Sequence, residues 1–181
     1  MNAIILHGTG DRNDAYWFPY AKNILEQKGY KVWLPQLPNA EKPNLQDWLS
    51  FVLENGEFSE DTILIGHSAG SQLILSILEN ISVKIKQAVL VSGYAKTLRS
   101  TGDGEKDEAE FNWTKIKNKF GQIVFINSDN DPWGCDDKQG RIMLDNLGGI
   151  LVIPHGQGHM GSSTYEQSYK EFPLLIKLLD F

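Results

Sequence analysis

Six short apolar runs, rich in β-branched residues, alternate along the chain with stretches of helical pattern. Each run has four or five residues and is nearly continuous in apolar character, as expected of parallel strands covered on both faces. The runs are residues 3–6, 31–34, 62–65, 87–91, 123–126 and 150–153. The helical stretches are residues 16–28, 45–53, 69–80, 113–120, 138–147 and 165–179. The alternation predicts an α/β protein with a six-stranded, mainly parallel, doubly wound sheet flanked by helices.

Length and charge limit the kinds of partner. A chain of 181 residues suits a single domain, residues 1–181, with a hydrophobic core of its own. Lys and Arg number 17 against 23 Asp and Glu, which gives a net charge of −6. Because an acidic chain is a poor generic partner for phosphate backbones and anionic lipids, we expect neither nucleic-acid nor membrane binding.

Cysteine content and the N-terminus bear on cofactors and location. The single cysteine, Cys135, excludes an internal disulfide framework, and no histidine and carboxylate pair has the helical spacing of metal ligands. We therefore expect neither a metal nor an organic cofactor. The apolar residues 1–6 lack the basic character and length of a signal peptide, so we expect a cytoplasmic protein.

One acidic segment interrupts the alternation after the fourth apolar run. Residues 100–110 contain five acidic residues, one lysine and two glycines, a composition typical of a solvated loop. Since functional sites of such sheets lie outside the carboxyl ends of the strands, this loop is placed to cover one. We predict a short lid-like insertion at residues 94–112.

The motif Gly66-His67-Ser68-Ala69-Gly70 directly follows the third apolar run and begins a helical stretch. A nucleophile on a sharp strand-to-helix turn needs small residues two positions before and after it, because a Cβ there would collide with the adjoining elements. The turn also places Ser68 at a helix N-terminus, where free amides favour negative charge. We predict that Ser68 is a catalytic nucleophile; the alternative is an ordinary glycine-rich turn.

A serine nucleophile needs an imidazole base, and the chain has four histidines. His7 and His67 lie in the first and third strand-to-helix turns, where each is a candidate for an orienting or packing role. His155 and His159 both follow the last apolar run, and the glycines before His159 give that side chain more reach. We predict that His159 is the base, with His155 as the alternative.

The base in turn needs a carboxylate, and an Asp-rich turn, residues 127–133, follows the fifth apolar run. Asp131 precedes a proline, which keeps it out of the helical region and suits a carboxylate that projects toward a loop histidine. We predict Asp131 as the orienting acid, with Asp129 as the alternative. Asp136 and Asp137 are typical of the N-cap and first turn of the next helix.

An oxyanion hole needs two preorganised donors, of which one is usually the amide after the nucleophile. Ala69 supplies that amide. The turn at residues 7–11 follows the first apolar run and contains the small residues that a second donor requires. We predict the Thr9 N–H as the second donor, with Gly10 next.

Two tryptophans lie just beyond these turns. We predict that Trp17 and Trp133 form walls of an acyl pocket; the alternative for each is core packing with a satisfied N–H. Cys135 also lies near the Asp-rich turn, but the sequence indicates no base that would deprotonate it. We interpret it as an unreactive thiol.

Taken together, these motifs resemble the small serine hydrolases of α/β-hydrolase fold related to retinoblastoma-binding protein 9 and YdeN. The resemblance implies Ser68 as nucleophile, Asp131 as acid and His159 as base, on a reduced hydrolase sheet. It does not imply binding to retinoblastoma protein, because Asn55 stands where the Leu-x-Cys-x-Glu motif has cysteine. The matching segments are residues 7–10, 17–18, 33–35, 37–38, 66–70, 128–132 and 158–159.

These residues favour a serine hydrolase that cleaves small carboxylic esters, thioesters or amides through an acyl-enzyme on Ser68. The expected partner is a small acyl substrate, and no particular protein partner is predicted. Acyl transfer to an alcohol or amine would use the same residues. The alternative from another class is a non-catalytic protein-interaction module that retains the hydrolase fold.

Overall fold

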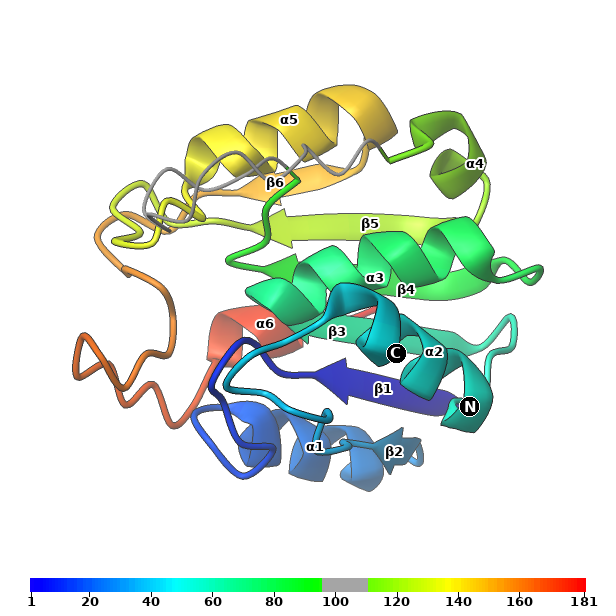
Figure 1. Ribbon diagram of the computed structural model, residues 1–181, viewed down its shortest axis with the longest axis horizontal. Helices are drawn as coiled ribbons and strands as arrows, with labels where there is room; N and C mark the ends of the chain where they lie inside the picture. Colours follow the sequence, from blue (N-terminus) through cyan, green and yellow to red (C-terminus); the bar gives the residue numbers. More distant parts are fainter. Residues whose placement is uncertain (96–110) are drawn as a thin grey trace.

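A computed structural model of the chain describes residues 1–95 and 111–181 and contains one six-stranded sheet (Figure 1). The strand order is β2-β1-β3-β4-β5-β6, and every neighbouring pair is parallel. The predicted six-stranded sheet flanked by helices is thus confirmed, and it is wholly rather than mainly parallel. The strands are β1 Asn2–Leu6, β2 Lys31–Trp33, β3 Thr62–His67, β4 Ile85–Val91, β5 Phe120–Ile126 and β6 Ile150–Val152.

Helices cover both faces of the sheet (Figure 1). Along β1, Ile4 and Leu6 point into one core while Ala3 and Ile5 point into the other, as the alternation of side chains in a strand requires. Trp48 of α2 packs in the first core and Phe18 of α1 in the second. The helices are α1 Phe18–Gln27, α2 Leu45–Asn55, α3 Ala69–Asn80, α4 Trp113–Lys117, α5 Asp137–Leu147 and α6 Pro173–Lys177.

Several helix ends follow the local signals of the sequence. The Asn44 side chain accepts hydrogen bonds from two amides in the first turn of α2, and Asp136 does the same for α5. Asp137 lies in the first turn of α5, as predicted. Gly29, just after α1, has a φ of +86°, a conformation that favours glycine at a helix C-terminus.

The predicted helix at residues 165–179 is largely wrong. Only Pro173–Lys177 is helical, and the preceding residues form an irregular loop. Ser162 and Gln167 pair there in an isolated antiparallel bridge, and Tyr169 adopts a positive φ of 37°. These long-range and backbone constraints override the apolar periodicity from which the helix was predicted. The predicted helix at 113–120 is also too long, because Phe120 already begins β5.

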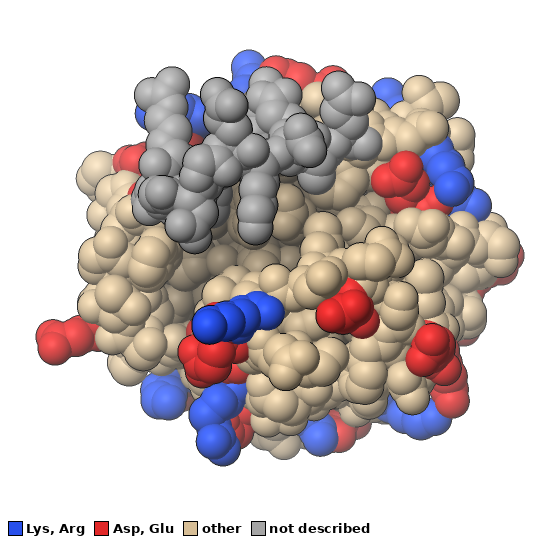
Figure 2. All heavy atoms as spheres, viewed as in Figure 1, with Lys and Arg blue, Asp and Glu red and all other residues tan. Residues whose placement is uncertain are grey.

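The predicted lid-like insertion at 94–112 falls mostly on residues 96–110, which lie outside the described residues, and it stays a prediction. Within the described ranges, no helix combines the length and apolar character needed to cross a membrane. Figure 2 shows acidic and basic side chains interspersed on one face of the molecule. The described Lys and Arg side chains therefore form no continuous basic patch on that face.

The turn between β3 and α3 depends on a backbone approach that only glycine permits. A methyl group on Gly70 would lie 2.6 Å from the carbonyl oxygen of His7 and closer still to that of Leu6. Both are backbone atoms at the end of β1, so no flexible side chain can move aside. The first turn of α3 therefore packs directly on the adjacent strand.

We expect Gly70→Ala to lower the free energy of unfolding by about 3 kcal/mol, because overpacking against backbone atoms shifts whole elements. Ser50→Ala, at an exposed position of α2, is the matched control and should change stability by less than about 0.5 kcal/mol. Urea unfolding followed by circular dichroism measures both. Equal stability of the two variants would contradict the close approach.

Candidate active site

Ser68 occupies the sharp turn between β3 and α3. Its φ of 53° and ψ of −120° are strained for a residue with a Cβ, and its amide donates to the carbonyl of Val91 at 2.9 Å. The buried Ser71 hydroxyl donates to the carbonyls of Gly66 and Val91 and ties the turn to β4. The strained backbone thus holds the Ser68 side chain above the carboxyl ends of the strands.

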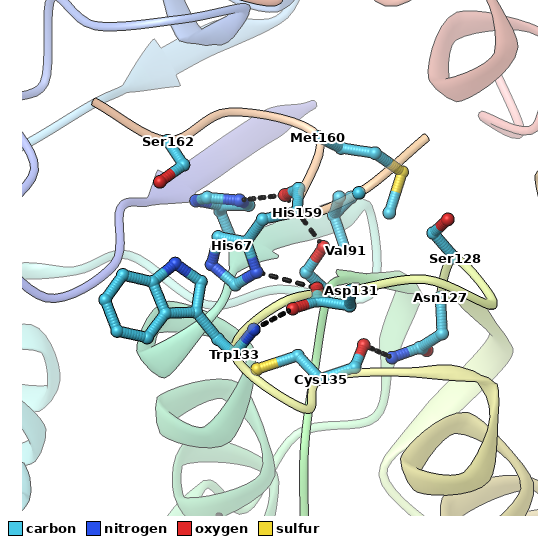
Figure 3. A network of polar contacts seen from close by, with 12 residues as sticks. His67, Val91, Asn127, Ser128, Asp131, Trp133, Cys135, His159, Met160 and Ser162 are labelled. Carbon is cyan, nitrogen blue, oxygen red and sulfur yellow. Dashed lines mark hydrogen bonds and ion pairs between the residues drawn. The ribbon is translucent and has the colours of Figure 1, made fainter. Parts of the chain in front are cut away.

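Asp131 and His159 form a buried pair beside this turn (Figure 3). Nδ1 of His159 donates to Oδ2 of Asp131 at 2.7 Å, and the other carboxylate oxygen accepts the Trp133 amide at 2.9 Å. Because the carboxylate is held by both bonds, it fixes the imidazole as the Nδ1–H tautomer and leaves Nε2 free of a proton. That is the form a general base requires.

The environment also keeps His159 uncharged near neutral pH. Burial lowers its pKa from the ordinary value of 6.5, and the charge of His67 lowers it further, while the hydrogen bond to Asp131 opposes both effects. The net direction is downward. His159 is therefore a free base at neutral pH.

The two alternative residues, His155 and Asp129, pair with each other at the surface. The imidazole of His155 is 94% exposed and bonds to Oδ2 of Asp129, whose other oxygen accepts the Gly156 amide. The structure thus separates two Asp–His pairs in the same pair of loops. Of these two pairs, Asp131–His159 is the buried one and lies at the Ser68 turn.

His7 and His67 have different buried surroundings. His7 donates from Nδ1 to the carbonyl of Gly8 at 2.9 Å and accepts the Leu37 amide at Nε2, also at 2.9 Å. It therefore joins the first strand-to-helix turn to the loop after β2. His67, at the end of β3, contacts the carbonyl of His159 and the carboxylate of Asp11.

The predicted oxyanion donors lie on both sides of Ser68. In the turn after β1, the Gly8 amide donates to Asp11 and the Gly10 amide to Ala40. These bonds leave the Thr9 N–H without a partner among the described residues, which favours Thr9 over Gly10 as a donor. Ala69 begins α3, so its amide also lacks an intrahelical acceptor.

A pocket of about 330 Å³ opens at Ser68 and His159. Trp133 lines it, as predicted, whereas the prediction for Trp17 is wrong. Trp17 is fully buried and its indole N–H donates to the carbonyl of Met160 at 3.0 Å, so it packs behind the pocket. The neighbouring Tyr16 is on the pocket wall instead. Tyr94, the first residue of the predicted insertion, also lines the pocket, and lining residues that the sequence reasoning missed are Glu41, Ser162, Ser163 and Thr164.

Cys135 lies beneath the site (Figure 3). Burial raises the pKa of its thiol well above the ordinary range, and the charge of Asp131 raises it further, while contact with the Ser68 hydroxyl opposes both. Its sulfur comes within 4.8 Å of ligand atoms of Asp131 and His159. Because the thiol stays protonated and the other two groups bond each other, the cluster suits acid–base chemistry better than a metal.

Comparisons with known proteins agree with this geometry. The model of the serine hydrolase family matches residues 3–180, and the chain therefore belongs to that family. Serine hydrolase RBBP9 of Rattus norvegicus is 26% identical over 172 residues, covering 91% of this chain and 90% of that protein. YdeN of Bacillus subtilis is 35% identical over 97 residues, about half the length of each chain.

Solved structures show the same fold. The crystal structure of the B. subtilis ydeN gene product superposes with a TM-score of 0.85 at 24% identity, covering 98% of this chain and 95% of that one. Est1E of Butyrivibrio proteoclasticus superposes with a TM-score of 0.63 at 14% identity, covering 92% and 84%. These matches confirm the predicted α/β-hydrolase fold for this chain.

We expect Asp131→Asn to reduce kcat for a short-chain p-nitrophenyl ester by about 10³–10⁴-fold. The new amide would still accept the Trp133 N–H through its oxygen and would then point its NH₂ at Nδ1 of His159, forcing the wrong tautomer. Asp129→Asn changes the neighbouring surface pair and is the matched control, with kcat near the wild-type value. Similar losses in both variants would refute the distinction between the two pairs.

The pH dependence of kcat/KM should follow the protonation of His159. Because the pKa of His159 is lowered from 6.5, we expect activity to persist below pH 6.5 and to be lost as the pH falls through that lowered pKa. Steady-state rates between pH 4.5 and 8, with folding checked by circular dichroism at each pH, measure the acid limb. An acid limb centred above 6.5 would contradict the assignment.

Proposed function

We propose that the protein hydrolyses small carboxylic esters, thioesters or amides through an acyl-enzyme on Ser68. The observation that carries this proposal is the buried 2.7 Å bond between Asp131 and His159, beside a strained turn that presents Ser68 to the same pocket. An activated serine requires this combination of nucleophile, base and orienting acid.

In the proposed reaction, Ser68 Oγ attacks the acyl carbon while Nε2 of His159 takes the hydroxyl proton. The amides of Thr9 and Ala69 bind the oxyanion, and the resulting imidazolium is stabilised by Asp131. The imidazolium then gives its proton to the leaving alcohol, thiol or amine. A water molecule, deprotonated by His159, attacks the acyl carbon. The bond to Ser68 Oγ then breaks, the imidazolium returns the proton to Oγ, and the carboxylic acid leaves.

The pocket supports a small acyl substrate. Its volume of about 330 Å³ is at the lower end of the range for small-molecule sites, and Tyr16 and Trp133 form aromatic walls. The proposed steps use only groups of this chain and require no cofactor. A cytoplasmic location, which the sequence predicts, is part of the same proposal.

A fluorophosphonate probe tests whether Ser68 is activated. We expect one covalent adduct by intact mass on the wild-type protein, mapped to Ser68 and absent from Ser68→Ala. Ser163→Ala removes a hydroxyl from the pocket wall and should still be labelled, which makes it the matched control. A folded wild-type protein without an adduct would overturn the proposal and favour the non-catalytic interaction module.

A further inference from the structure

His67 has a hydrogen-bond acceptor at each ring nitrogen. Its Nε2 lies 2.9 Å from the carbonyl oxygen of His159, and its Nδ1 lies 3.3 Å from Oδ2 of Asp11. The His67 side chain is 1% exposed and that of Asp11 is 11% exposed, so water cannot readily take the place of either partner. Figure 3 shows the His67 ring pointing at the main chain of His159.

The hydrogen-bond partners of His67 determine which of its ring nitrogens carry a proton. A carbonyl oxygen only accepts, so Nε2 must carry a proton, and an ionised carboxylate also only accepts, so Nδ1 must carry one too. Oδ2 of Asp11 already accepts the Gly8 amide at 3.1 Å, which favours the ionised form. His7 provides the contrast, because its Nδ1 faces an acceptor, the Gly8 carbonyl, whereas its Nε2 faces donors, the Leu37 amide and the Gln36 side chain, so a neutral ring satisfies it.

The loop segment that carries His159 is held in place by hydrogen bonds to side chains outside it. Gly158 and Met160, on either side of it, both have positive φ values, 59° and 54°. The His159 amide donates to the side chain of Gln167, and its carbonyl accepts from the Ser92 hydroxyl as well as from His67, all at 2.9 Å. The backbone of the base is thus fixed by side chains from three other parts of the chain.

We propose that His67 is a positioning residue, held as an imidazolium by Asp11, that fixes His159 through its main-chain carbonyl and places a positive charge beside the ring of the base. This inference rests on the proposed function, because it assigns His159 the role of base. Neither His67 nor Asp11 is required to touch the reacting atoms.

The electrostatics agree with this geometry. The His67 and His159 ring centroids are 4.8 Å apart, and the charge of His67 lowers the pKa of His159. The hydrogen bond from His67 lowers the pKa of Asp11 against the effect of burial. The groups that face the two imidazoles, and that a pH profile must consider, are Asp11, His7 and Tyr16 around His67, and Asp131 and Cys135 around His159.

Two substitutions of His67 separate the effect of its hydrogen bond to the His159 carbonyl from the effect of its positive charge. His67→Gln places an amide NH₂ near the former Nε2, within reach of the His159 carbonyl, but carries no charge. His67→Asn places its amide near the former Nδ1, beside Asp11, and cannot reach that carbonyl. His155→Gln changes the exposed histidine and is the matched control.

For p-nitrophenyl ester hydrolysis, both His67 variants should move the acid limb of kcat/KM upward by about 0.5–1 pH unit, because a cation next to His159 is lost. On the pH plateau, kcat should fall by about 10–100-fold in His67→Asn, because the hydrogen bond that positions the His159 main chain is lost. In His67→Gln, which keeps that hydrogen bond, kcat should fall by less than about 5-fold. His155→Gln should change neither quantity. Unmoved acid limbs and equal plateau rates in both His67 variants would overturn the inference.

The protonation of His67 can also be measured on the wild-type protein without any turnover. In ¹⁵N imidazole NMR of the wild-type protein at pH 7, His67 should show both ring nitrogens protonated and His159 only one. The His67 signals are assigned by their loss in His67→Gln. A neutral His67 ring would refute the inference even if fluorophosphonate labels Ser68, whereas an unlabelled Ser68 with a charged His67 would refute the proposed function alone.

Discussion

The site depends on the contact between the first turn of α3 and the carboxyl end of β1. Because Gly70 has no side chain, α3 begins directly against the backbone of Leu6 and His7. Gly8 extends the same contact, since a methyl group on it would lie 2.9 Å from the Cβ of Ser68. The two chain segments that carry the proposed nucleophile and the proposed oxyanion donor Thr9 are thereby brought together by backbone contact. Side-chain packing alone would leave both turns free to move.

The proposed base comes from a different kind of structure. His159 lies in an irregular loop, and its position is set by polar side chains rather than by a helix or strand. Asp131 holds the ring, Gln167 holds the amide, and His67 and Ser92 hold the carbonyl. Because each bond is buried or partly buried, breaking one would leave an unsatisfied polar group, which makes the arrangement stiff.

Sequence reasoning succeeded where local chemistry decides the structure. The bounds of α3, Ala69–Asn80, follow directly from a turn motif and an apolar helix, and the pairing of Asp131 with His159 follows from the order of strand ends. It failed for Trp17, because adjacency in sequence does not reveal which way an indole points. For His67 it offered an orienting or packing role but could not name the partners, which are 56 and 92 positions away along the chain.

The Asp131–His159 pair, whose imidazole is neutral, lies beside the Asp11–His67 pair, whose imidazole we propose to be charged. A cation next to His159 keeps more of the base unprotonated at neutral pH, but it also weakens that base and disfavours the imidazolium formed during catalysis. Asp131 offsets the second effect, because its carboxylate bonds the same ring at 2.7 Å. Asp11 bonds His67 and not His159, so it compensates the positive charge without taking the place of the orienting acid. In the proposed mechanism, the balance between these two carboxylates sets the pH at which Ser68 is activated.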